Sequence, residues 1–203
     1  MLGSEFLIFA VILRVLSGLD YLLATLGGQA KPNPVTWLFW GLAPLVAFLA
    51  QIEKTIEPSA WVTLALSAGP LLIFVVSLTK GRRWKVGPFD ILCGASAGIG
   101  IVLWQITSDP VMAIIFGILA DILGGIPTII KSYKVPGSEK ATPYLLSVCS
   151  MVLTLATIQS WRFVDYAFPV YILLINILLF VLISTRMGER TPKILDNTQP
   201  VRR

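Results

Sequence analysis

The chain has 203 residues, of which 56% are hydrophobic and only 13% are charged. A soluble domain has about 25% charged residues, so this composition excludes an ordinary water-soluble protein. The 16 Lys and Arg residues against 11 Asp and Glu residues give a net charge of +5. We interpret this excess as membrane topology and expect no nucleic-acid partner, because cytoplasmic loops of membrane proteins collect Lys and Arg.

The apolar residues gather in runs of roughly 20 residues, the length of helix that crosses a bilayer. The first run lacks the basic start and cleavage site of a signal peptide, so we expect it to remain as a helix. We predict an all-α membrane protein with seven transmembrane helices, at residues 5–27, 35–53, 59–79, 87–106, 110–131, 142–159 and 164–185.

Prolines mark several of the predicted helix starts. Proline in the first turn costs no hydrogen bond, since that N–H has no partner within the helix. This position fits Pro34, Pro58, Pro88, Pro110 and Pro143. The residues after 185 are polar, and we predict that they form a disordered cytoplasmic tail.

Basic residues are divided unequally between the two sides of the predicted membrane. One side receives only Lys54 and Arg162, and Arg14 lies within the first helix. The other side receives Lys31, Lys80, Arg82, Arg83, Lys85, Lys131, Lys134, Lys140, Arg186, Arg190, Lys193, Arg202 and Arg203. This asymmetry predicts an integral protein of the cell (inner) membrane, with its N-terminus outside and its C-terminus in the cytoplasm.

The first three helices and the last three align without a gap when the chain is shifted by 107 residues, the separation of Arg14 from Asp121. Identical pairs include Phe9 with Phe116, Gly18 with Gly125, Leu38 with Leu145, Ser77 with Ser184 and Arg83 with Arg190. The alignment predicts two parallel three-helix repeats, 5–79 and 110–185, joined by a linker helix at 87–106 and followed by the tail 186–203. Transporters built from such repeats bind solutes at the repeat interface near the middle of the membrane.

Residues 126–144 read IPTIIKSYKVPGSEKATPY. Pro127-Thr128, followed by Lys131, Lys134, Ser138-Glu139 and Pro143-Tyr144, resembles the end of the first helix and the start of the second in SWEET and PQ-loop transporters. The resemblance covers about residues 5–188 and is closer in the second repeat than in the first. It implies seven helices in a 3+1+3 plan with the N-terminus outside.

The resemblance further implies that prolines on the first two helices of each repeat act as hinges for alternating access. Pro127 and Pro143 match that role, and a proline inside a helix removes one hydrogen bond and bends the helix. A static kink near a helix end is the alternative. In the first repeat, Asp20 and Thr36 occupy these positions, and Pro44 lies further along the second helix.

Two ionisable residues fall near the middle of predicted helices. Arg14 and Asp121 are equivalent under the 107-residue shift, and such groups usually face a partner or an aqueous space because lipid exposure is costly. We predict that they form an ion pair or jointly line the solute site; a purely structural pair is the alternative. Asp20 lies nearer the cytoplasm, as a gate residue or as a group that reaches the interface.

Three further polar or aromatic side chains are candidates for solute contact. The resemblance implies a sugar-contacting role for Asn176, with an interhelical hydrogen bond as the alternative. Thr154 is a second candidate, although its hydroxyl can bond the carbonyl four residues earlier, which is a packing role. Trp40 is the third, but Trp37 and Trp40 share one helical face and favour an interfacial aromatic belt.

These features favour a transporter that moves a small polar solute, a sugar or similar metabolite, across the bilayer. A receptor or scaffold of the same fold is the alternative, and a homo-oligomer is compatible with either. We expect no enzyme, cofactor or metal site, because the chain has no histidine and no carboxylate cluster. Residues 164–185 contain no lysine for a retinal Schiff base. Proton coupling would fall to Asp121 or Asp20.

Overall fold

The computed structural model describes residues 4–54, 58–79, 85–107, 110–158 and 161–190, and these residues are predominantly helical. The seven long helices lie at the predicted positions, so the all-helical fold class is confirmed. The helices are η1 (Ser4–Phe6), α1 (Leu7–Leu26), α2 (Pro34–Lys54), α3 (Pro58–Thr79), α4 (Pro88–Ile106), α5 (Pro110–Lys134), η2 (Pro136–Ser138), α6 (Thr142–Thr157), α7 (Phe163–Thr185) and α8 (Met187–Arg190). Outside the described residues lie Lys80, Arg82, Arg83, Lys193, Arg202 and Arg203 of the topology prediction.

Helix boundaries follow the prolines at the starts and differ from the prediction at two ends. Four helices begin on a proline, α2, α3, α4 and α5. Helix α5 continues to Lys134, beyond the predicted end at 131. The predicted disordered tail begins instead with the short helix α8, after Arg186 in a left-handed conformation ends α7. The rest of the tail, 191–203, lies outside the described residues.

Three helical segments are long and apolar enough to cross a membrane, Leu7–Leu26, Ile114–Lys134 and Asp165–Thr185. On α1 the outward-facing side chains are large and apolar, with Ile8 61% exposed and Leu23 65% exposed. Such a surface is unfavourable in water and favourable in lipid, so it indicates membrane association.

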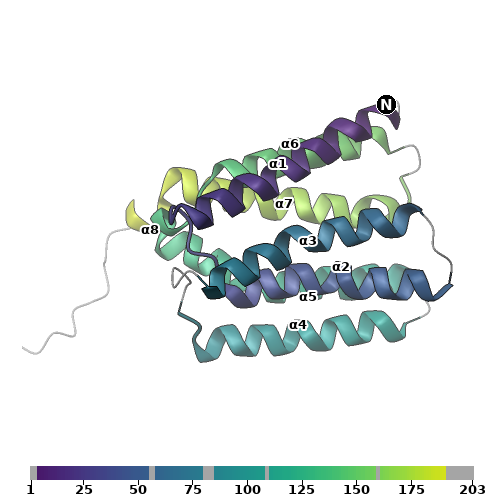
Figure 1. The fold of residues 1–203 in the computed structure, drawn as a ribbon, viewed down its shortest axis with the longest axis horizontal. Helices are drawn as coiled ribbons and strands as arrows, with labels where there is room; N and C mark the ends of the chain where they lie inside the picture. The colour runs from purple at the N-terminus through teal and green to yellow at the C-terminus, as the bar shows by residue number, and fades with distance from the viewer. Residues whose placement is uncertain (1–3, 55–57, 80–84, 108–109, 159–160, 191–203) are drawn as a thin grey trace, which may run out of the picture.

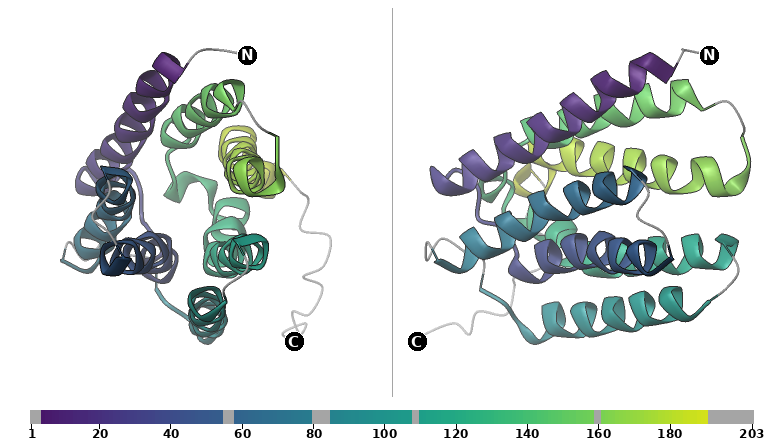
Figure 2. Two further views of the ribbon diagram at one scale, coloured as in Figure 1. Left: turned by 90° about the vertical axis from the view of Figure 1, so that its right-hand side faces the viewer. Right: turned by 45° about the vertical axis from the view of Figure 1, so that its right-hand side comes forward.

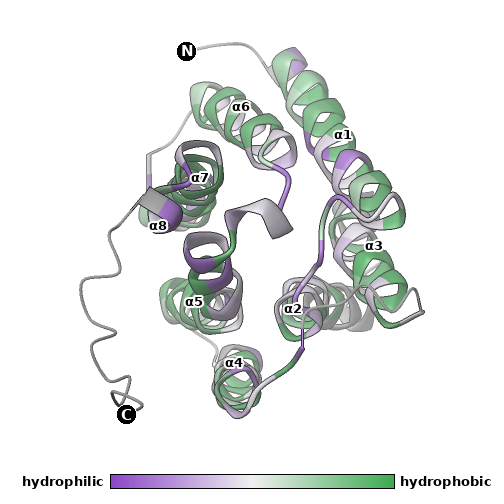
Figure 3. Cartoon of the chain, turned by 90° about the vertical axis from the view of Figure 1, so that its left-hand side faces the viewer, coloured by the Kyte–Doolittle hydropathy of each residue, from purple (hydrophilic) through white to green (hydrophobic). Residues whose placement is uncertain are grey.

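The long helices form a ring, which is clearest when viewed end-on (Figure 3). Around the ring the order is α1, α3, α2, α5, α7 and α6, with α6 packed against α1 to close it. Helix α4 packs outside the ring, against α5 and α2 (Figures 1 and 2). The ring thus places α1–α3 on one side and α5–α7 on the other, and they meet at α1–α6 and at α2–α5.

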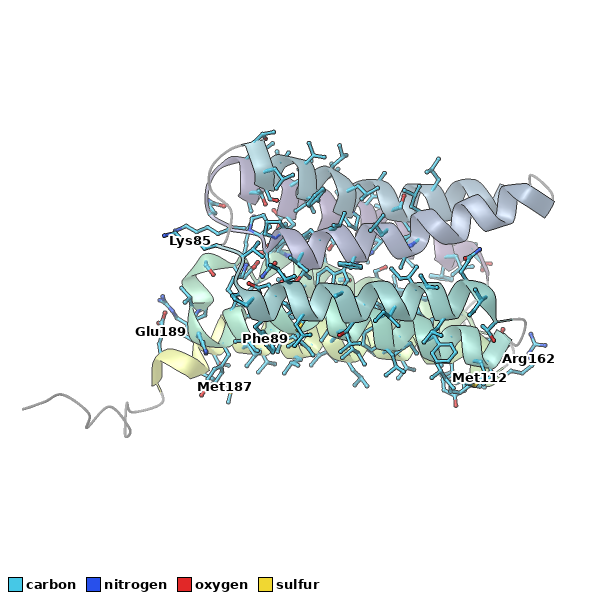
Figure 4. All side chains as sticks on the ribbon, turned by 90° about the horizontal axis from the view of Figure 1, so that it is seen from below. Lys85, Phe89, Met112, Arg162, Met187 and Glu189 are labelled. Carbon is cyan, nitrogen blue, oxygen red and sulfur yellow. The ribbon has the colours of Figure 1, made fainter. Side chains whose placement is uncertain are left out.

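The two ends of the ring differ in what closes them. At the end where α1 and α5 finish, the η2 turn lies in the middle of the ring (Figure 3). Lys85 and Glu189 lie at this same end, and Arg162 lies at the opposite one (Figure 4). We call the end that carries η2 the basic end, since most Lys and Arg residues of the connectors belong to it.

Candidate functional site

A buried ion pair lies at the basic end. Lys131 of α5 pairs with Glu139, which follows η2, and the two side chains are 1% and 0% exposed. The ammonium of Lys131 also donates to the carbonyl of Lys31, at 2.5 Å. The carboxylate of Glu139 accepts hydrogen bonds from the hydroxyls of Tyr21, at 2.7 Å, and Tyr144, at 3.3 Å. Both charges are therefore paired and hydrogen-bonded, as a stable buried ion pair requires.

The η2 turn brings this pair together. Glu139 comes shortly after the end of α5, and Pro136–Ser138 turns the chain back so that Glu139 reaches Lys131. The backbone N–H of Glu139 closes this turn by donating to the carbonyl of Pro136. The connector after α1 lies beside it, where the N–H of Lys31 donates to the carbonyl of Ser138 at 2.8 Å. The ion pair therefore joins α5 to the first half of the ring through Tyr21 and Lys31.

An aromatic cluster adjoins the ion pair. The ring of Tyr21 lies 4.3 Å from that of Trp37 and 6.1 Å from that of Tyr144. Trp40 contacts Trp37 edge-on, at 5.2 Å. Trp37 is only 7% exposed. The predicted aromatic belt is therefore wrong for Trp37, because this face of α2 turns toward the other helices and away from the outer surface.

A second ion pair at the basic end is partly open to solvent. Lys140 contacts Asp20 of α1 at 2.5 Å, and their side chains are 32% and 25% exposed. Next to it the hydroxyl of Ser17 donates to the carbonyl of Pro143, at 2.7 Å. Asp20 therefore takes part in a contact between α1 and the segment that leads into α6.

Arg14 and Asp121 lie deeper along their helices and form no direct ion pair with each other. Arg14 donates from Nη1 to the hydroxyl of Ser147 on α6, at 2.7 Å. Asp121 accepts at Oδ2 from the hydroxyl of Tyr171 on α7, at 2.5 Å, and its backbone carbonyl accepts from the indole N–H of Trp40, at 3.4 Å. Both side chains are half-buried, and their opposite charges interact at longer range. The predicted direct ion pair between Arg14 and Asp121 is therefore not formed. Joint lining of a solute site by the two residues stays a prediction.

Two polar candidates bond within their own helices. The side-chain amide of Asn176 donates to the carbonyl of Ile172, at 2.7 Å, so this N–H group forms no interhelical bond. The hydroxyl of Thr154 donates to the carbonyl of Ser150, at 2.9 Å, which is the packing arrangement. Neither Asn176 nor Thr154 forms a hydrogen bond with Arg14 or Asp121.

The candidate hinge prolines fall into two groups. Pro127 lies inside α5 and Pro44 lies inside α2, where each removes a backbone hydrogen bond of the helix. Pro143 lies in the first turn of α6. At that position, which the sequence predicted, it interrupts no helical hydrogen bond, and its hinge role stays a prediction.

Several residues at this site escaped the sequence-based prediction. In the sequence, Lys131 and Glu139 resemble the charged residues of any polar connector. The tyrosines of the site resemble aromatic residues on the apolar face of a helix; they are Tyr21, Tyr144 and Tyr171. The available signal was the Pro-Gly turn between Lys131 and Glu139, which brings opposite charges together. Among the described residues, no group of three or more His, Cys, Asp or Glu side chains could hold a metal ion.

No protein-family model matches the chain, and neither a curated protein nor a solved structure is significantly similar to it. The function is therefore argued from the arrangement of the residues described above.

Proposed function

We propose that the protein is a SWEET-like membrane carrier with seven transmembrane helices in a 3+1+3 plan. It moves a small polar solute through the centre of the helix ring by alternating access. The observation that carries this proposal is a set of contacts between the two halves that recur at the 107-residue repeat distance. The following contacts support it.

Two hydrogen bonds correspond to each other under the repeat. Arg14 donates to Ser147, and the repeat equivalents of these two residues, Asp121 and Trp40, also share a hydrogen bond. The first bond joins α1 to α6 and the second joins α5 to α2, so exchanging the two halves exchanges the bonds. Two-fold symmetry between the halves accounts for both.

A third contact is expected only where the two repeats meet at their axis. The backbone of Lys31 bonds that of Ser138, and these residues are themselves 107 positions apart. Equivalent positions of two repeats approach each other closely only near the symmetry axis. The helix contacts agree with this symmetry. The repeat relates α1 to α5 and α2 to α6, so the α1–α6 contact and the α2–α5 contact are equivalent. A parallel repeat of this kind is an established transporter plan.

In this proposal, the pair Lys131–Glu139 and its tyrosine partners close the cytoplasmic end. Arg14 and Asp121 face the solute from the two halves. Opening the cytoplasmic end requires that the buried pair separate, while Pro127 and Pro44 provide the flexible points of α5 and α2. The N-terminus lies outside, and the connectors at the basic end lie in the cytoplasm.

Transport is tested with purified protein in proteoliposomes. Vesicles receive a mixture of sugars and amino acids, and mass spectrometry identifies which compound enters faster than into empty vesicles. We expect selective uptake by the wild type that falls when Asp121→Asn is introduced. Folded, correctly oriented protein that moves none of the solutes would contradict the carrier proposal and favour the receptor or scaffold alternative.

Orientation is checked independently by labelling. A cysteine introduced by Lys134→Cys should react only from the cytoplasmic side, and one introduced by Lys54→Cys only from outside. Outside labelling at position 134 would overturn the seven-helix topology and the repeat with it.

A further inference from the structure

Arg14 and Asp121 both have hydrogen-bonding capacity that the protein leaves unused. A guanidinium has five N–H donors, and Arg14 uses only Nη1, toward Ser147. A carboxylate has about four acceptor positions, and among the described residues only the hydroxyl of Tyr171, at Oδ2, and the neighbouring indole of Trp40 approach that of Asp121. Both side chains are half-buried, and their spare atoms are not among the fully buried unpaired atoms of the described residues. These atoms therefore retain some accessible surface.

The two charges are opposite in sign, and separate junctions of the ring hold them. Ser147 fixes Arg14 at the α1–α6 junction, whereas Tyr171 and Trp40 hold Asp121 beside α7 and α2. Ionisable groups at membrane depth are costly and mark functional sites when they face the interior of a helix bundle. Their hydrogen-bond partners here are neutral, and the two charges balance each other only at longer range.

We infer that Arg14 and Asp121 together bind a zwitterionic solute of the amino-acid class. Arg14 receives the carboxylate and Asp121 receives the ammonium, so the solute bridges the two halves. The inference rests on the proposed carrier function and specifies its substrate class. A zwitterion forms a charge-assisted hydrogen bond at both residues, and the occupied site gains no net charge.

Other classes of solute satisfy the site less well. A sugar is neutral and supplies no counter-charge in direct contact with Arg14 or Asp121. A simple cation or anion pairs with one of them and leaves the other unpaired in a low-dielectric interior, which is unfavourable. Sites that require two charged contacts reject analogues that lack either one.

The experiment measures binding to the full-length protein in detergent or nanodiscs, from the shift in its melting temperature. The probes are L-alanine, L-leucine and L-glutamine, their N-acetyl derivatives, their methyl esters, and glucose. We expect at least one free amino acid to stabilise the wild type. Its N-acetyl and ester forms should bind about 10- to 100-fold more weakly, since each loses one charge-assisted bond.

Variants test the two residues directly. Arg14→Gln and Asp121→Asn should each weaken amino-acid binding about 10- to 100-fold, for the same loss of one charged contact. The matched control is Arg162→Gln, which removes an exposed arginine paired with Asp165 at the other end of the molecule and should leave binding unchanged. The exchange Arg14→Asp with Asp121→Arg retains both charges and should recover part of the binding.

Three results would overturn this inference. They are equal binding of the N-acetyl or ester derivatives, unchanged binding in both Arg14→Gln and Asp121→Asn, and stabilisation by none of the amino acids. The carrier proposal is judged separately, because uptake of glucose or another solute in the proteoliposome assay would uphold it even if the zwitterion site were disproved.

Discussion

Two places in the ring carry opposite charges, and they are built differently. At the basic end, Lys131 and Glu139 contact each other directly, are fully buried and have additional hydrogen-bond partners. Deeper in the ring, Arg14 and Asp121 are half-buried and each bonds a neutral side chain. The first arrangement stabilises one conformation of the protein. The second is the arrangement that we propose for binding a solute.

The comparison also gives the reason why we assign the gate of the proposed carrier to the buried pair. Bringing two charges out of water carries a large desolvation cost, which is recovered only while the partners remain together. A conformation that separates Lys131 from Glu139 must therefore admit water to both. Closure and dehydration of the basic end are linked in this way, and no such link applies to Arg14 and Asp121.

The largest expected effect comes from Glu139→Gln. It removes the Glu139 charge from the buried Lys131 ammonium, and breaking a buried ion pair in this way costs ~3–5 kcal/mol. The expected result is a marked fall in the melting temperature of the purified protein. Glu189→Gln is the matched control, because it removes the same charge from the exposed pair with Arg186 and should cost at most about 1 kcal/mol. Equal losses in the two variants would contradict the comparison.

An intermediate effect is expected at the tyrosines that bond Glu139. Tyr21 lies 2.7 Å from the carboxylate and Tyr144 lies 3.3 Å from it, which is long for an O–H donor. Tyr21→Phe should therefore cost about 1.5–3 kcal/mol, the range for a hydrogen bond to a charged group, and Tyr144→Phe should cost less. Thermal unfolding of the two variants measures the difference. A larger loss in Tyr144→Phe would show that the two bonds have been ranked in the wrong order.

The smallest effect is expected at the partly exposed pair of Asp20 and Lys140. Solvent screens this pair, so Lys140→Gln should cost about 0–1 kcal/mol despite the short 2.5 Å contact. Whatever loss appears should shrink as salt is added. Melting curves at low and high ionic strength test both points, and a salt-independent loss as large as that of Glu139→Gln would make Asp20 part of the buried gate.

Helix positions were predictable because their signals are local. Runs of apolar residues and prolines in the first turn depend only on neighbouring residues, and the observed starts at Pro34 and Pro88 follow them. The end of α5 was predicted at Lys131 because the apolar run stops there, three residues before the observed end at Lys134. In the structure both residues belong to its last turn, and Lys131 is buried by contacts with distant parts of the chain.

Only those residues of the candidate site whose signal is local could be predicted from the sequence. Arg14 and Asp121 stand out because charge is rare within an apolar run. Glu139 does not stand out, since its burial depends on the η2 turn and on Tyr21, which is 118 positions away. Trp37 was assigned to the outer surface because the position of an aromatic residue near a helix end does not reveal which face its neighbours cover.

The most direct test of alternating access is a distance measurement across the basic end. Spin labels replace Leu26 of α1 and Lys134 of α5, both at exposed positions in opposite halves, in a background carrying Cys93→Ala and Cys149→Ala. Double electron–electron resonance should give one short distance between the two spin labels in the wild type. A second, longer population should appear in Glu139→Gln, because loss of the Glu139 charge leaves the Lys131 ammonium more stable in the hydrated, open end. A single unchanged distance in a folded Glu139→Gln protein would contradict the gate and the carrier proposal that depends on it.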